Sequence, residues 1–152
     1  MTAELLKDWL VRAKRKTRAH TLAANHYQRL HYWTGIPSAI LSAVTGTAVF
    51  AEIQTNPATQ WKYFVVAIVL LAAALTAVQT FLNFGERARQ HKSFAARFSK
   101  IRREIDVATS DGSKLQDVIP QIQKLFDEAM DDNEPSIPNR IWKDTEKKYP
   151  TA

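Results

Sequence analysis

Hydroxyl side chains recur along one face of a segment that carries no charge. Thr34, Ser38, Ser42 and Thr45 are spaced by four, four and three residues, which places them on one side of an α-helix. The same face, continued, reaches the carboxylate of Glu52. In an apolar environment such a stripe either lets another helix approach closely or lines a water-filled path, with Glu52 forming a ring of carboxylates at its mouth in an oligomer. Both interpretations remain open on the sequence alone.

A second set of polar side chains lies near the end of the next uncharged segment, on one side of it: Thr76, Gln79, Thr80 and Asn83. If the two segments form an antiparallel hairpin, Gln79 and Asn83 lie at about the depth of Thr34 and Ser38. We therefore expect polar contacts between the two helices. Contacts of this kind contribute about 0.6 to 2 kcal/mol each.

Residues for enzymatic chemistry are not evident. There is no glycine-rich phosphate loop, no nucleophile elbow, no zinc-binding HExxH and no cysteine, so we predict neither catalysis nor a metal or cofactor. Of the four histidines, His20 and His91 fall on apolar stripes of two different helices, and we expect them to meet. They could act as a hydrogen-bonded structural pair or as a pH-sensitive one.

Two long uncharged segments must position these residues. Tyr32–Ala51 has twenty residues and Tyr63–Phe84 has twenty-two, and a helix of about 20 residues covers the roughly 30 Å hydrocarbon layer of a bilayer. The turn signal Asn56-Pro57 lies between them, and Trp61 and Tyr63 suit a membrane interface. The sequence therefore predicts a transmembrane helical hairpin.

Positive charge flanks this hairpin on both sides. Seven Lys or Arg residues precede it and seven follow within residues 85–103, whereas the connection holds only Lys62. By the positive-inside rule, both termini then lie in the cytoplasm. The membrane topology thus accounts for the net charge of +6. Nucleic acid is therefore not an expected partner. The cluster Lys14, Arg15, Lys16 and Arg18 is either a solvated face or a contact for lipid headgroups or an acidic partner.

Beyond the hairpin, an apolar stripe at spacings of three and four predicts a cytoplasmic stem helix that continues from the second span and packs through His91, Phe94, Phe98, Ile101 and Ile105. Asp111-Gly112 is expected to end it, and Ser113 to cap a further helix that Pro120 kinks or splits. The predicted fold is all-α, an integral membrane hairpin with a cytoplasmic helical bundle. The expected segments of this single domain, 1–152, are a cytoplasmic helix (1–31), a first span (32–52), an external loop (53–62), a second span (63–84), the stem (85–110), a helix (113–130) and a tail folded against the bundle (131–152).

Several local strings resemble the SLATT family of two-membrane-helix effector domains. They are Ala23-Ala24-Asn25-His26-Tyr27, Gly35-Ile36-Pro37, Ser42-Ala43-Val44-Thr45-Gly46-Thr47 with Ala48-Val49-Phe50, Gln79-Thr80-Phe81-Leu82-Asn83-Phe84, the stem residues His91, Ala95, Ala96, Phe98 and Arg103-Glu104-Ile105, and Pro135-Ser136-Ile137-Pro138. Their order and spacing together carry the resemblance.

The resemblance implies a homo-oligomeric effector that forms a pore in, or permeabilises, the bacterial inner membrane. The implied setting is defence against phage, with cell death or arrest triggered by an upstream sensor such as a nucleotidyltransferase that makes a cyclic nucleotide. Two alternatives remain. The hairpin could merely tether a module that recruits a cytosolic partner, or both apolar segments could lie inside a soluble helical bundle.

Overall fold

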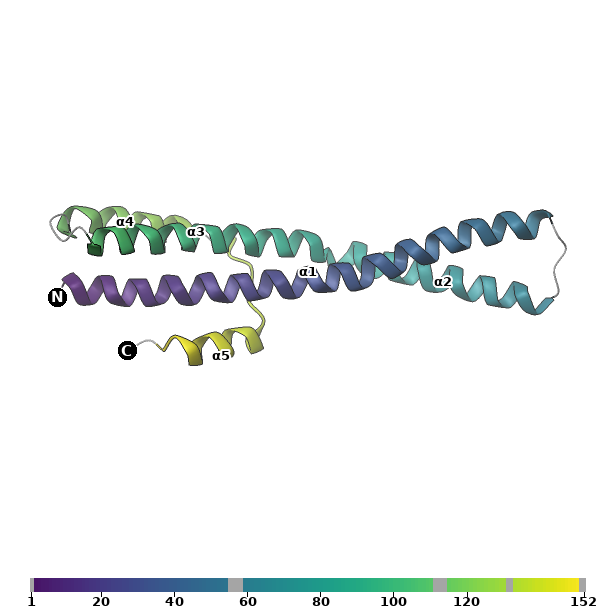
Figure 1. Ribbon diagram of the computed structural model, residues 1–152, viewed down its shortest axis with the longest axis horizontal. Coiled ribbons are helices and arrows are strands. Elements are labelled where there is room, and N and C mark those ends of the chain that lie inside the picture. The colour runs from purple at the N-terminus through teal and green to yellow at the C-terminus, as the bar shows by residue number, and fades with distance from the viewer. Residues whose placement is uncertain (1, 55–58, 111–114, 131–132, 151–152) are drawn as a thin grey trace. The chain divides into compact units, whose positions relative to one another are not determined.

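The computed structural model describes residues 2–54, 59–110, 115–130 and 133–150, with backbone alone for residues 2–3, 48–54, 59–62 and 115–117. All regular structure in these ranges is helical (Figure 1). The helices are α1 (Thr2–Gln54), α2 (Thr59–Leu82), α3 (Phe84–Ser110), α4 (Leu115–Ala129) and α5 (Asn139–Lys148). The chain divides into two compact units, unit 1 (Met1–His26 and Glu86–Ala152) and unit 2 (Tyr27–Gly85).

Unit 1 has a hydrophobic core because α1, α3 and α4 each present an apolar stripe. The stem stripe is buried throughout: His91, Phe94, Phe98, Ile101 and Ile105 are each at most 6% exposed. Leu6 and Ala13 come from α1, and Ile122 and Phe126 from α4. The tail joins this unit through α5, where Thr145 is buried and Trp142 lies beside the first part of α1.

Residues 2–31 and the expected first span form one continuous helix, α1, although a boundary between them was predicted. Pro37 therefore lies inside a helix and not near the start of one. Because proline has no amide hydrogen, Pro37 does not donate the helical hydrogen bond to the Trp33 carbonyl one turn earlier. Neither Gly35 nor Pro37 ends this helix, although glycine and proline are the residues that most often mark a helix end.

The predicted continuous helix from the second span into the stem is interrupted at Asn83. This residue has φ 41°, the left-handed region, and separates α2 from α3. Asparagine tolerates that conformation better than most residues, and its amide still donates to the Gln79 carbonyl at 3.1 Å. Asn83 is thus the junction residue between α2 and α3.

Pro120 lies within α4, which is continuous from Leu115 to Ala129, so the proline does not split this helix. The expected stop at Asp111-Gly112, the cap at Ser113 and the turn at Asn56-Pro57 lie outside the described residues.

Candidate functional site

A hydrogen bond between hydroxyl groups joins the two helices of unit 2. Ser38 Oγ lies 2.8 Å from Thr76 Oγ1, and Ser38 is only 6% exposed. Thr76 Oγ1 also donates to the Ala72 carbonyl at 2.9 Å. Because a hydroxyl carries one hydrogen, Ser38 must be the donor to Thr76. Ser38 therefore faces α2, and its partner is Thr76, not the Gln79 or Asn83 expected from depth alone.

Gly35 allows a second close approach between α1 and α2. A Cβ placed on Gly35 would lie 2.9 Å from Gln79 Nε2, closer than side-chain carbons come to neighbours. Further along, the rings of Tyr27 and Phe84 stack with centroids 6.4 Å apart. As the residue number on α1 rises from Tyr27 to Ser38, the residue number of its partner falls from Phe84 to Thr76. The two chain segments therefore run antiparallel in unit 2, as in a hairpin.

The other members of the hydroxyl stripe have different environments. Thr34 and Thr45 are half-buried, and Ser42 is exposed. The Thr45 hydroxyl is buried and has no hydrogen-bond partner among the described residues. Thr80 is exposed and donates to the Thr76 carbonyl at 2.9 Å. The Glu52 side chain lies outside the described residues, so the stripe is seen only up to Thr45.

Most of the exposed large apolar side chains of the protein lie in unit 2. On α1 they include Trp33, Ile36 and Ile40; on α2 they include Tyr63, Phe64, Leu70 and Phe81. Soluble monomers rarely expose a contiguous apolar surface of this kind. Such a surface suits contact with lipid or with other copies of the chain.

In the part of the chain that the structure describes, one helical stretch within Tyr63–Ser110 is apolar and long enough to cross a membrane. Its mean hydropathy is 2.4 and only 6% of it is buried. The apolar residues of that range belong to α2. The first expected span, 32–52, is described with its side chains only as far as Thr47 and is not among such helices.

Unit 1 holds a separate polar cluster, in which His20 is fully buried and central. His20 Nδ1 lies 3.0 Å from His91 Nδ1, and His20 Nε2 lies 3.0 Å from Glu134 Oε1. Lys16 Nζ donates to both oxygens of the same carboxylate, at 2.6 and 2.9 Å. The cluster thus links α1, α3 and the segment that leads to α5.

The protonation of this cluster follows from its surroundings. Burial, reinforced by the neighbouring His20 and opposed by Glu134, lowers the pKa of His91 from 6.5 to about 4, so His91 is neutral at pH 7. Burial alone would raise the pKa of Glu134, but hydrogen bonds from His20 and Lys16 outweigh it and lower the pKa. An ionised carboxylate only accepts, so His20 Nε2 carries a hydrogen toward Glu134. One hydrogen then lies between the two Nδ1 atoms.

A family model described as "SMODS and SLOG-associating 2TM effector domain family 4" matches residues 4–112. The chain belongs to this SLATT family. The match confirms the resemblance seen in the sequence. Comparisons with curated proteins and with solved structures gave no match.

The SLATT match ends before α4, so the tail residues that contact α1 lie outside the matched range. Glu134 and Trp142 both belong to this C-terminal region and both contact Lys16 of α1. Sequence reasoning missed the role of Glu134, because its partner is 118 residues away. Glu134 also follows Asp131 and Asp132 closely in the sequence, and a run of acidic residues usually lies in solvent.

The predicted basic cluster of the SLATT domain is not one solvated face. Lys16 is paired with Glu134 and lies over the rings of Phe98 and Trp142. Arg15 lies over Trp142 with its Cζ 5.2 Å from the ring centre. Lys14 is half-buried and Arg18 is exposed. Lys16 therefore differs from the prediction, because the tail supplies it with a carboxylate inside the same unit.

Proposed function

We propose that this SLATT protein crosses the bacterial inner membrane twice and permeabilises it as a homo-oligomer. The spans are residues 32–52 of α1 and residues 63–84, with both termini in the cytoplasm. An upstream sensor that produces a nucleotide signal, such as a nucleotidyltransferase, triggers the opening, and the loss of the ion gradient kills or arrests an infected cell. The protein acts by changing permeability and not by catalysis.

The observation that carries this proposal is the inverted polarity of unit 2. The hydroxyls of Ser38 and Thr76 meet between the helices, while Trp33, Ile40 and Leu70 point outward, each at least 58% exposed. In water this arrangement would be costly, since apolar surface contributes about 25 cal/mol per Å² when buried. In a bilayer the outward residues contact lipid and the polar groups satisfy one another.

A homo-oligomer follows from geometry. Two helices cannot enclose a water-filled path, so several hairpins must surround one, most simply with cyclic symmetry. Ser42 is exposed on α1, and a side chain on Gly46 would meet nothing within 4 Å. This part of α1 is therefore one surface of unit 2 on which small and hydroxyl-bearing residues stay open to another copy or to water. We place it toward the axis and α2 toward lipid.

The second candidate function is a tethered interaction module. The observation in its favour is that unit 1 has its own core, from Leu6 to Ala129, and its own polar cluster. A compact cytoplasmic unit could hold a partner while the hairpin serves only as an anchor.

The experiment that tests the proposal is conductance in planar bilayers containing the purified chain with its sensor signal. Ser42→Leu and Glu52→Ala should reduce conductance at least tenfold while cross-linked oligomers persist, because they remove polar groups from the proposed path. Leu70→Ile, on the face of α2 toward lipid, is the matched control and should conduct normally. Full conductance by the assembled Ser42→Leu, Glu52→Ala double variant would contradict the assignment.

A further inference from the structure

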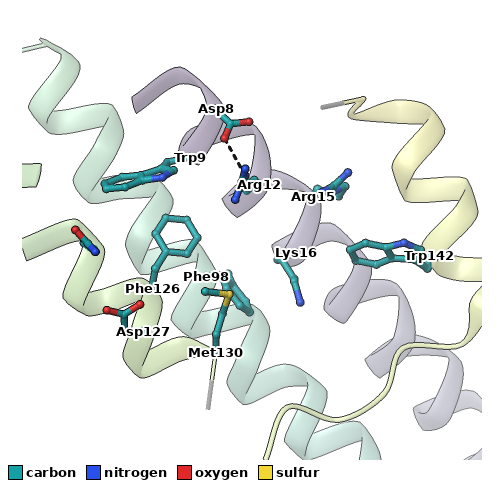
Figure 2. Close-up of a pocket in the computed structure, with 11 residues that line it drawn as sticks. Asp8, Trp9, Arg12, Arg15, Lys16, Phe98, Phe126, Asp127, Met130 and Trp142 are labelled. Carbon is teal, nitrogen blue, oxygen red and sulfur yellow. Dashed lines mark ion pairs between the residues drawn. The ribbon is translucent and has the colours of Figure 1, made fainter. Parts of the chain in front are cut away.

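Unit 1 contains a cavity of about 880 Å³ between α1, α3, α4 and α5. Figure 2 shows Trp9 and Phe126 together on one side and Trp142 on the other, with Arg12, Arg15 and Lys16 projecting from α1 between them. Small-molecule sites typically measure 300 to 1,000 Å³ and combine apolar walls with a few polar groups. None of the functions discussed above uses this cavity.

The cations in the cavity are not equivalent. Arg12 is paired with Asp8 at 2.8 Å, and Lys16 is paired with Glu134. Arg15 has neither an ion pair nor a hydrogen bond among the described residues, and its Nε is buried without a partner. A buried guanidinium nitrogen without a hydrogen-bond partner lowers the stability of the fold. A bound anion would accept from the Arg15 guanidinium group, most favourably through two parallel N–H hydrogen bonds.

Aromatic rings provide the walls. The Trp142 ring lies 5.2 Å from Arg15 Cζ and 5.6 Å from Lys16 Nζ. Trp9 and Phe126 pack with ring centres 5.9 Å apart. A planar ligand group that stacks on Trp142 would take the place of these two cations on the ring, and Arg15 and Lys16 would then be free to bind an anion attached to it.

The far side of the cavity offers acceptors. Asp127 and Gln123 of α4 line it, and Figure 2 shows Asp127 across the cavity from Arg15. A carboxylate there suits hydroxyl or amino groups, which donate hydrogen bonds. The ligand that fits has an anion at one end, a planar ring, and hydrogen-bond donors at the other end.

We propose that this cavity binds a nucleotide, with a phosphate on Arg15 and Lys16, the base stacked on Trp142, and ribose hydroxyls or a base amino group toward Asp127. A phosphate on Lys16 competes with Glu134, so binding loosens the contact that anchors the tail. The inference concerns the cavity alone and does not require the chain to form a pore.

Binding is measured by isothermal titration calorimetry on the full chain in detergent, with ATP, AMP, a cyclic dinucleotide (cyclic di-AMP), inorganic diphosphate and tryptophan as probes. At least one nucleotide should bind, with quenching of tryptophan fluorescence, and more tightly than diphosphate or tryptophan. Arg15→Gln should weaken it by about tenfold to a hundredfold, the usual loss for a hydrogen bond to a charged group. Trp142→Leu should weaken it about tenfold or more through lost stacking.

Arg18→Gln is the matched control, because Arg18 is exposed on the same helix and does not line the cavity. It should bind as the unaltered chain does. Arg15→Lys keeps the charge and should retain part of the affinity, which separates loss of a contact from loss of folding. The proposal is overturned if no nucleotide binds at millimolar concentration, if diphosphate or tryptophan binds as tightly as the best nucleotide, or if folded Arg15→Gln binds normally.

Discussion

His20 Nδ1 and His91 Nδ1 lie 3.0 Å apart although 71 residues separate them in the sequence. Both side chains are buried, at 0% and 1% exposure, and the ring of His20 stacks on Phe98 with an interplanar angle of 10°. The pair therefore lies within the core of unit 1, where the protonation of His91 is coupled to folding.

Acid is expected to destabilise unit 1. The pKa of His91 is lowered to about 4 in the folded chain from 6.5, so the unfolded chain binds the proton first. This contribution to stability is complete above pH 6.5 and is lost as the pH falls toward 4. The pKa of Glu134 is also lowered, which adds a loss below its ordinary value of 4.5. The groups facing His91 include His20, Glu134 and, beyond the carboxylate, Lys16.

Thermal unfolding by circular dichroism in detergent at pH 7, 6, 5 and 4 checks this prediction. The Tm should fall steadily below pH 6.5, and His91→Asn should flatten the part of the curve between pH 6.5 and 5. A Tm that stays constant between pH 7 and 5 in the unaltered chain would show that His91 does not titrate as described.

Glu134→Gln should loosen the tail. The change removes the charge that pairs with half-buried Lys16 and accepts from His20, at a cost of about 1 to 2 kcal/mol. Limited trypsin digestion should then cleave faster at Arg140 and Lys143 of α5. Glu146→Gln is the matched control, because Glu146 is exposed on the same helix. Equal cleavage rates for the two variants would contradict the anchoring role of Glu134.

Much of unit 1 could be predicted from the sequence because burial follows helical periodicity. Phe94, Phe98, Ile101 and Ile105 recur on one face of α3, and this spacing predicts which face of the helix is buried in the core. The meeting of His20 and His91 followed from the same reasoning, since both fall on apolar stripes. The contact between Lys16 and Glu134 could not be foreseen, because no periodicity relates a helix to an irregular segment.

Unit 2 was harder to predict in detail. Composition indicates an apolar hairpin, but the register that pairs Ser38 with Thr76 depends on the length of the connection and on how closely Gly35 lets α2 approach. The break at Asn83 depends on a single left-handed residue, which hydrophobic periodicity does not reveal. The continuity of α1 was missed because a change in composition at residue 32 resembles a boundary.

Phe98→Ala should destabilise unit 1 by about 3 to 5 kcal/mol, the usual cost of emptying a buried aromatic site. Phe98 is fully buried and contacts His20, Phe126 and Lys16. Val107→Ala on the same helix is the control, because Val107 is 63% exposed and should lose little. Chemical denaturation monitored by tryptophan fluorescence measures both, and comparable losses would be inconsistent with the described core.

The two glycines of α1 in unit 2 should differ in their tolerance of a large side chain. Gly35→Leu would collide with Gln79, whereas Gly46→Leu would meet open space. We expect a lower Tm in detergent for Gly35→Leu, and little change for Gly46→Leu in a monomer. If both variants unfold at the same temperature, the close packing of α1 on α2 at Gly35 is not present in the protein.

The central claim, that the hairpin itself permeabilises the membrane, is tested most directly by recording membrane potential and dye entry in bacteria that express the chain with its sensor during phage infection. The measurement compares the unaltered chain with one whose residues 32–84 are replaced by an unrelated transmembrane hairpin. The account predicts depolarisation with the unaltered chain and an intact potential with the replacement. An intact potential in both, or equal cell death with the replaced hairpin, would contradict it and favour a tethered module.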